Sequence, residues 1–364
     1  MKIGFYGGAF DPFHIEHKNS LLQVYKELNL DKIVVYPSFL PPHKSCIGNF
    51  DDRLATVEVG TSDMPFVIID DIEKVRDKVN PTCEVLPLLK DKYPADDHYL
   101  IIGGDSMLNF YRWIRPDLIA KECKIAVIRR EGIDLKDNVI NAKNSFNADI
   151  TVVNYVGKNV SSSITKAEIM LGNQPLAIEE KVYNLIRERK MYGDFEAIVN
   201  KLKTTIPEKT FLHSCRTVKY ALKLNVAIGL DYKKVFLSAL LHDCAKHLHQ
   251  DIPSVPQAVE HQYIGATVAK HEYGIVDSEI LDAIRYHSTG KPNMTTLGKL
   301  IYCADMLEEG RNYPGVEDLR AIIEKDFNVG FLTCVKSSLN RLLIDCKEID
   351  PLTKQCHTYY NNEK

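Results

Sequence analysis

Two histidines near the beginning of the chain, His14 and His17, lie three positions apart and follow the glycine pair Gly7 and Gly8. Residues three apart share one face of a helix, so both imidazoles are expected at the N-terminal end of a helix. Glycines let a phosphate approach the backbone, and the helix dipole with its unpaired N–H groups favours negative charge there. The two imidazoles could then donate hydrogen bonds to charge that develops on a reacting phosphate.

A second group of residues in the other half of the chain has the composition of a metal site. It contains His213, the adjacent pair His242 and Asp243, His261, His287 and Asp305. A lone histidine on a helix is more often a core residue than a ligand, but four histidines and two aspartates spread over five predicted helices argue for ligands. Imidazole and carboxylate together suit iron, manganese or zinc, and one carboxylate shared between two ions would give a bimetallic site.

The elements that must position the first group alternate between strand and helix. Apolar runs predict strands at Ile3–Tyr6, Ile33–Tyr36, Phe66–Asp70, Tyr99–Ile102, Ile125–Ile128 and Ile150–Val153. Helical patterns between them predict an α/β doubly wound parallel sheet, in which ligands bind at the carboxyl ends of the strands. Gly7 and Gly8 are expected to end the first strand, with Asp11 as the cap and Pro12 in the first turn of the helix that follows.

Strand signals stop near residue 195, and amphipathic helices run from there to the C-terminus. The helical patterns cover about residues 211–229, 232–247, 262–273, 277–287, 295–308 and 328–346. We therefore expect two domains, residues 1–194 with the parallel sheet and residues 195–364 all-α, which agrees with a length of 364 residues.

Composition and charge exclude several classes of protein. The formal net charge of -3 gives no general attraction to nucleic acid or membranes, so any nucleotide must be bound by local groups. The chain has no long uncharged apolar run, and it opens directly into a strand, so neither a signal peptide nor a membrane span is expected. The nine cysteines include no Cys-x-x-Cys pair, which is typical of reduced thiols in a cytoplasmic protein.

The run from Gly7 to His17 resembles the signature of the nucleotidyltransferase superfamily that carries a His-x-Gly-His motif. Its Gly-Gly-x-Phe-Asp-Pro portion, which includes Phe10, is typical of nicotinate mononucleotide adenylyltransferases. Two positions depart from the family pattern: Ala9 replaces a serine or threonine, and Glu16 replaces the glycine between the histidines. A carboxylate at position 16 must point away from the triphosphate, because it would otherwise oppose binding.

Later segments resemble the phosphate-binding motifs of the same family. Lys44 ends a Pro-Pro-His-Lys loop that the resemblance places over the nucleotide, where its ammonium would reach the phosphates. Ser161, Ser162 and Ser163 match a serine-rich segment that holds the β- and γ-phosphates of ATP. Lys166 stands where the family has arginine, so it keeps the charge and loses the bidentate fork. The resemblance assigns catalysis to His14, His17, Lys44 and Lys166, together with Mg²⁺ bound to ATP.

The remaining family motifs concern the pyridine nucleotide and the ribose. The resemblance implies that Thr82 bonds the nicotinate carboxylate and that Trp113 stacks on the pyridine ring, although core packing is the commoner fate of a tryptophan. Pro81 replaces a family tyrosine and removes a backbone donor, which leaves the choice between acid and amide substrates open. The other binding residues carried over are Gly7, Gly8, Ala9, Phe10, Gly104, Asp105 and Arg130.

The order of ligands in the second half resembles the HD-domain metal-dependent phosphohydrolases. The segments 281–290 and 302–315 are similar to the bacterial family that splits diadenosine tetraphosphate symmetrically into two ADP. The resemblance implies two divalent or trivalent metal ions, with iron favoured, held by His213, His242, Asp243, His261, His287 and Asp305. It also makes Thr289 and Arg311 candidate phosphate contacts.

Together the resemblances imply transfer of AMP from ATP to nicotinate mononucleotide by the first domain and hydrolysis of diadenosine polyphosphate by the second. Two alternatives stay open: an HD domain that binds a nucleotide as a sensor without turnover, and a first domain that adenylylates nicotinamide mononucleotide or a pantetheine phosphate. The sequence leaves open whether the chain forms a homo-oligomer.

Overall fold

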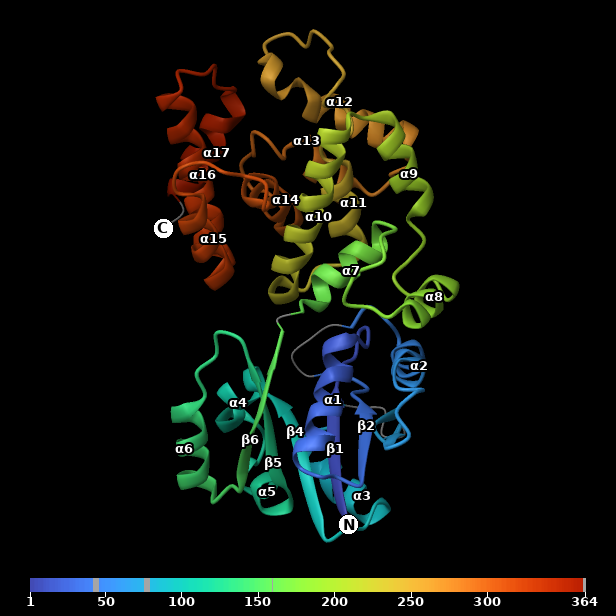
Figure 1. Cartoon of the computed structure of the whole chain (residues 1–364). Coiled ribbons are helices and arrows are strands. Elements are labelled where there is room, and N and C mark those ends of the chain that lie inside the picture. The colour runs from blue at the N-terminus through green and yellow to red at the C-terminus, as the bar shows by residue number, and fades with distance from the viewer. Residues whose placement is uncertain (42–45, 75–78, 159, 363–364) are drawn as a thin grey trace. The chain divides into compact units, whose positions relative to one another are not determined.

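The computed structural model describes residues 1–41, 46–74, 79–158 and 160–362. The chain forms two compact units (Figure 1). The first consists of Met1–Thr165 and Gln174–Tyr192, and the second of Lys166–Asn173 and Gly193–Lys364. The segment Lys166–Asn173, which sequence reasoning placed in the first domain, therefore groups with the second unit.

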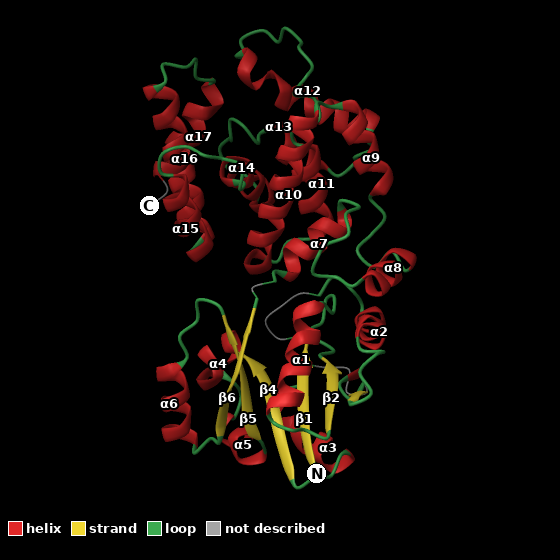
Figure 2. Ribbon diagram, in the orientation of Figure 1, coloured by secondary structure: helices red, strands yellow, loops and turns green. Residues whose placement is uncertain are grey.

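The first unit is built on one six-stranded parallel sheet with the strand order β3-β2-β1-β4-β5-β6 (Figure 2). Its strands are β1 (Lys2–Gly8), β2 (Lys32–Pro37), β3 (Val67–Ile69), β4 (Asp97–Gly103), β5 (Lys124–Arg130) and β6 (Ile150–Gly157). The predicted α/β doubly wound sheet is confirmed, and the strand order reverses between β1 and β4. That reversal is where ligands bind in sheets of this kind.

Helices cover both faces of this sheet because side chains alternate along each strand. The helices of the first half are α1 (Ile15–Glu27), α2 (Phe50–Gly60), α3 (Thr82–Lys92), α4 (Gly104–Leu108), α5 (Pro116–Glu122), α6 (Lys136–Phe146), α7 (Ser162–Met170) and α8 (Glu180–Glu188). On β4, Leu100 packs into the core with α3, α5 and α6, while its neighbour Ile101 packs into the core with α1 and α2. Each strand thus contributes to two cores.

The beginning of α1 differs from the prediction. The glycine pair does not break β1 after Tyr6 but forms its last two residues: Gly7 pairs with Tyr36, and Gly8 pairs with Pro37 on β2. A Cβ atom on Gly7 would lie 2.6 Å from the Tyr36 ring, so only glycine fits there. Helix α1 then starts at Ile15 with His14 as its N-cap. Asp11 does not cap the helix because its carboxylate accepts hydrogen bonds from the distant backbone N–H groups of residues 47 and 48.

The second unit is all-helical, as predicted. Its helices are α9 (Glu196–Thr205), α10 (Glu208–Ile228), α11 (Tyr232–Leu241), α12 (Gln257–Glu272), α13 (Ser278–Arg285), α14 (Thr296–Leu307), α15 (Val316–Lys325), α16 (Phe327–Ile344) and α17 (Pro351–Asn362). Helix α14 packs against α10, α11, α13, α15 and α16, and its apolar side chains are buried. No helix within the described part of the chain is long and apolar enough to span a membrane.

Sequence reasoning missed α9, α15 and α17. Helix α17 has little helical propensity, because it is rich in Thr, Tyr and Asn. Tertiary contacts stabilise it instead: Cys356 and Tyr360 are buried, and the Tyr360 hydroxyl accepts a hydrogen bond from the Met294 backbone at 2.7 Å. The predicted helix over 232–247 ends earlier, at Leu241, and a series of turns follows.

Candidate functional site

The first group of candidate residues gathers at the carboxyl edge of the sheet. Because the strands are parallel, the ends of β1, β4 and β5 meet there, on both sides of the point where strand order reverses. Asp105, just after β4, forms an ion pair with Arg130 at the end of β5, with 3.2 Å between Oδ1 and Nε. Gly104 is buried beside them as the first residue of α4. The edge therefore brings together residues that lie far apart in sequence.

The two histidines at the start of α1 form a reciprocal capping box. The backbone N–H of His17 donates to Nδ1 of His14 at 3.4 Å, and the backbone N–H of His14 donates to Nδ1 of His17 at 3.2 Å. Their rings stack with centroids 3.6 Å apart. Because each Nδ1 accepts, a neutral ring carries its proton on Nε2. The cap thus prepares both imidazoles as Nε2–H donors.

The loop that leads from β1 to these histidines is held by a buried arginine that sequence reasoning missed. Arg53 on α2 is 1% exposed, and its guanidinium donates to the carbonyls of Ala9 at 2.6 Å, Phe39 at 3.1 Å and Gly48 at 3.2 Å. These carbonyls belong to the segments that follow β1, follow β2 and precede α2. A single side chain therefore joins the β1–α1 loop to both ends of the β2–α2 loop at the ligand edge.

Asp11 and Tyr192 complete this network. The Tyr192 hydroxyl donates to Asp11 at 3.1 Å, and burial together with the nearby carboxylate raises the pKa of Tyr192 well above its usual value.

No sequence signal identifies Arg53, because an arginine on an amphipathic helix is usually interpreted as a surface residue.

The predicted pyridine contacts lie at the start of α3 and after α4. Thr82 is the first residue of α3 and is half-buried, and Pro81 precedes it as the N-cap. Trp113 is also half-buried, packed against the core with its ring 5.5 Å from that of Phe110. The core contact accounts for part of the indole, and stacking on a pyridine ring stays a prediction for the rest.

The predicted phosphate contacts lie at the start of α7. The hydroxyls of Ser161 and Ser163 are 2.8 Å apart, and Ser161 also accepts from the backbone N–H of Ile164 at 3.4 Å, so it caps the helix. Ser162 is the first residue of α7, and Lys166 lies one turn later. Lys44 lies outside the described residues.

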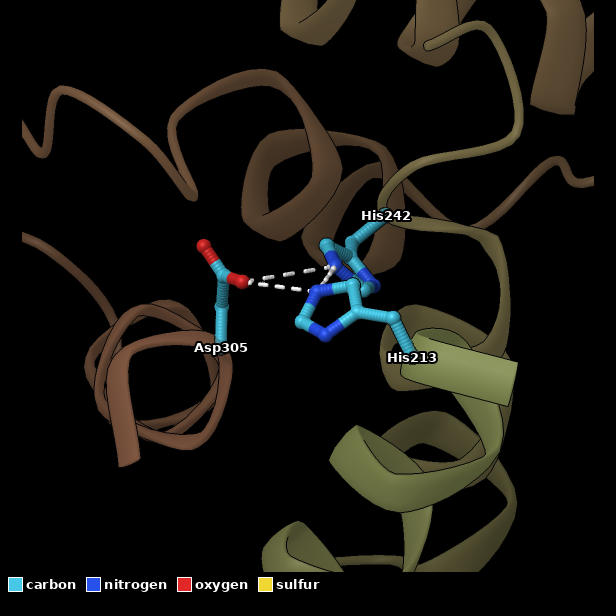
Figure 3. A group of neighbouring side chains, drawn as sticks. All are labelled: His213, His242 and Asp305. Atoms are coloured by element: carbon cyan, nitrogen blue, oxygen red, sulfur yellow. Dashed lines mark hydrogen bonds and ion pairs between the residues drawn. The ribbon is translucent and has the colours of Figure 1, made fainter. Parts of the chain in front are cut away.

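The second group converges inside the helical unit. His213 comes from α10, His261 from α12 and Asp305 from α14, while His242, Asp243 and His287 follow the ends of α11 and α13. Figure 3 shows the rings of His213 and His242 turned toward the Asp305 carboxylate. His242 is fully buried and His287 is 1% exposed. All six predicted ligands are therefore neighbours.

The six residues divide into two subsites around Asp243. In the first, Nε2 of His213 lies 2.9 Å from Asp305 Oδ1 and 3.1 Å from Nε2 of His242, and both rings lie within 3.8 Å of Asp243 Oδ2. In the second, Asp243 Oδ1 lies 3.2 Å from Nε2 of His261 and 3.4 Å from Nε2 of His287. One carboxylate thus presents one oxygen to each subsite.

Hydrogen bonds on the far side of the rings prepare two of the histidines as ligands. Nδ1 of His242 donates to the Ala239 carbonyl at 2.7 Å, and Nδ1 of His287 donates to the Ile284 carbonyl at 2.8 Å. Each Nε2 therefore carries a lone pair that points into the group of six predicted ligands. Burial lowers the pKa of His242 to about 3, which keeps that imidazole neutral. Nitrogen lone pairs and carboxylate oxygens that converge in this way fit two cations.

The third imidazole of this kind, His213, is oriented by a carboxylate. Its Nδ1 lies 3.1 Å from Glu308, which is also bound by Arg216 at 2.6 Å. Burial alone would lower the pKa of His213, but the hydrogen bonds to Asp305 and Glu308 raise it to about 9.

One cationic side chain stands at each subsite. Arg311 approaches the first, with NH2 bonded to Asp305 and 3.3 Å from Nε2 of His213. Lys246 approaches the second, with Nζ 2.9 Å from Nε2 of His261 and 3.4 Å from Asp243. Both side chains are about two-fifths exposed, at 40% and 44%. Sequence reasoning named Arg311 and missed Lys246, which lies three residues after Asp243.

Thr289, the other predicted phosphate contact, is 1% exposed. Its hydroxyl donates to the Gly290 carbonyl at 3.0 Å and accepts from the Gln262 amide at 3.0 Å. A role in phosphate binding stays a prediction for this residue.

The sheet with its reversal point and paired histidines, and the helical unit with its buried His and Asp cluster, define a nucleotidyltransferase joined to an HD domain. Comparison with protein families agrees: residues 5–168 match the cytidylyltransferase-like family, and residues 210–310 match the HD domain. A Shewanella pealeana protein described as a probable nicotinate-nucleotide adenylyltransferase is 30% identical over 210 residues, 53% of this chain and 97% of that protein.

For the second half, a symmetrical bis(5'-nucleosyl)-tetraphosphatase of Staphylococcus aureus is 35% identical over 178 residues, 44% of this chain and 90% of that protein. Over both halves, a Mycoplasma genitalium protein described as a probable nicotinate-nucleotide adenylyltransferase/Ap4A hydrolase is 26% identical over 329 residues, 85% of this chain and 88% of that protein. The chain therefore belongs, in its first half, to the nicotinate-nucleotide adenylyltransferase family and, in its second, to the HD-domain family of symmetrical bis(5'-nucleosyl)-tetraphosphatases.

Proposed function

We propose that residues 1–194 transfer AMP from ATP to nicotinate mononucleotide, which gives nicotinate adenine dinucleotide and pyrophosphate. The observation that carries the proposal is the pair of Nε2–H donors that the capping box prepares at the start of α1. Donors fixed in advance stabilise charge as it develops on the α-phosphate, without reorganisation during the reaction. The names of relatives that match this half supply the substrate class.

In this proposal the phosphate of the mononucleotide attacks the α-phosphorus of ATP in line. His14 and His17 donate to the α-phosphate, Lys44 and Lys166 neutralise the triphosphate, and Ser161 to Ser163 hold its outer phosphates. Mg²⁺ bound to ATP would supply further charge neutralisation. Thr82 and Trp113 would contact the pyridine ring of the mononucleotide and so select this substrate. The pair of Asp105 and Arg130 would bind the nucleotide at the point where the strand order reverses.

The test compares acid and amide substrates with the purified full-length protein, Mg²⁺ and ATP. Pyrophosphate release and dinucleotide formation are measured with nicotinate mononucleotide and, separately, with nicotinamide mononucleotide. We expect the acid to have the higher kcat/KM. A preference for the amide would overturn the substrate, and turnover of pantetheine phosphate alone would overturn the whole assignment.

We further propose that residues 195–364 hydrolyse diadenosine tetraphosphate to two ADP. The observation that supports this is the position of Asp243, which offers one oxygen to each of two imidazole-containing subsites. Metal ions bound there, which we propose to be iron, would act as Lewis acids that activate a water molecule and polarise a phosphate of the substrate. Arg311 and Lys246 lie at opposite subsites and are partly exposed, so each can turn toward one phosphate of the substrate.

The product pattern tests this second activity. Symmetrical cleavage gives ADP alone, whereas asymmetrical cleavage gives AMP and ATP, and chromatography separates them. We expect ADP alone from the metal-loaded protein. Binding of the substrate without any product would instead support a sensor domain, and AMP with ATP would place the cleaved bond elsewhere.

A further inference from the structure

Glu16, the residue that replaces the family glycine between the two histidines, is buried at the start of α1 and is 8% exposed. Its carboxylate faces β6. Oε2 accepts hydrogen bonds from the Tyr155 hydroxyl at 2.8 Å and from the backbone N–H of Lys158 at 2.9 Å, and Oε1 accepts from Asn19 at 3.2 Å. A glycine at this position could make none of these bonds.

A second carboxylate on the same helix makes a similar contact further down. Glu27 accepts from the backbone N–H of Asn154 at 3.0 Å and from its side-chain amide at 2.9 Å. Positions 16 and 27 are eleven apart, about three helical turns, so both carboxylates leave the same face of α1. Helix α1 is therefore tied to β6 at two points.

The strand β6 is built to receive these contacts. It is the last strand in the sheet order, and among the described strands it pairs only with β5. The register shifts there: Ile128 pairs with Val153, and the next residue, Arg129, pairs with Val156. Asn154 and Tyr155 therefore have no register partners on β5, where the Arg129 side chain instead donates to the Asn154 carbonyl, and this bulge turns Tyr155 toward Glu16.

We propose that Glu16 is a positioning residue for the adenylyl transfer proposed above, on which this inference rests. Its carboxylate joins the helix start that bears His14 and His17 to the end of β6, and Lys158 on that end lies three residues before Ser161. It thereby fixes the end of β6, the strand that precedes the triphosphate-binding serines in the chain, relative to the imidazoles. Glu27 makes the same kind of contact at the other end of α1, away from the serines.

The experiment compares Glu16→Gln with the matched control Glu27→Gln in the full-length protein. Glutamine keeps the size of the side chain but loses the negative charge, and with it the charge-assisted bond to a backbone N–H. We expect Glu16→Gln to raise the KM for ATP roughly tenfold while the KM for nicotinate mononucleotide and kcat stay within about threefold. Glu27→Gln should lower the melting temperature and leave the KM for ATP unchanged.

Hydrogen exchange supplies a readout that does not depend on turnover. Amide exchange at Lys158 should rise roughly tenfold in Glu16→Gln and stay unchanged in Glu27→Gln, with the reverse pattern at Asn154. Equal KM values for ATP in the two variants would overturn the proposal, as would unchanged exchange at Lys158. If the wild-type protein makes no dinucleotide, the proposed function fails. Amide exchange at Lys158 in Glu16→Gln still decides whether Glu16 holds the end of β6.

Discussion

Replacement of Arg53 by methionine should strongly destabilise the first unit and disorder its ligand edge. Methionine fills much of the space of the aliphatic stem but donates no hydrogen bond, so the carbonyls of Ala9, Phe39 and Gly48 lose their partner. A carbonyl left unpaired inside a protein costs about 1 to 2 kcal/mol, which gives a total of about 3 to 6 kcal/mol. For a unit of this size each kcal/mol shifts the melting temperature by about 2 to 4 °C, so we expect a fall of about 6 to 24 °C.

Scanning calorimetry of the full-length protein measures this effect. Arg189→Met is the matched control, because the Arg189 side chain is 43% exposed and pairs with Asp52 at the surface, where such pairs contribute about 1 kcal/mol or less. Arg53→Lys should fall between the two, since a compact ammonium cannot reach three separated carbonyls. If Arg53→Met melts within about 2 °C of Arg189→Met, the three bonds do not stabilise the loops and our reasoning is refuted.

Three further predictions concern the two chemistries. His17→Ala should lower kcat for adenylyl transfer roughly a hundredfold, because it removes a donor aimed at developing charge, and near-normal kcat would remove His17 from catalysis. Trp113→Ala should weaken binding of nicotinate mononucleotide and spare ATP in separate titrations; loss of folding instead would assign Trp113 to the core. Chelation should lower the melting temperature of the helical unit by removing ions that bind only its folded form, and added metal should restore it. An unchanged transition on chelation would argue against an ion held by the six ligands.

Much of the fold could be predicted because its strands have strong local signals. Each apolar run that predicted a strand corresponds to one of the six strands, and the alternation of strand and helix was sufficient to predict the parallel sheet. The order of the strands and the bulge in β6 could not be predicted, since they depend on pairing between distant segments.

Local sequence indicated the surroundings of some candidate residues and not of others. The six HD-domain residues carry a distinctive composition, and the structure brings all of them together. Asp11 was assigned to the cap of α1 from local sequence, but backbone groups more than thirty residues away bind its carboxylate instead. The role of Arg53 could not be predicted either, because its partners are backbone carbonyls of distant segments that only folding brings within reach.

The most direct test of the account is a paired measurement on Asp243→Ala in the full-length protein. Asp243 offers an oxygen to each subsite, so its loss should empty or cripple both and abolish cleavage of diadenosine tetraphosphate. Asp282→Ala, which removes a surface carboxylate paired with Lys291 in the same unit, is the control and should keep its metal and its hydrolysis. Metal content and hydrolysis are measured together with dinucleotide synthesis from ATP and nicotinate mononucleotide. We predict that Asp243→Ala loses metal and hydrolysis and keeps synthesis. Loss of dinucleotide synthesis in a folded variant would contradict the proposal that the two activities are independent. Intact hydrolysis would contradict the assignment of Asp243 as a metal ligand.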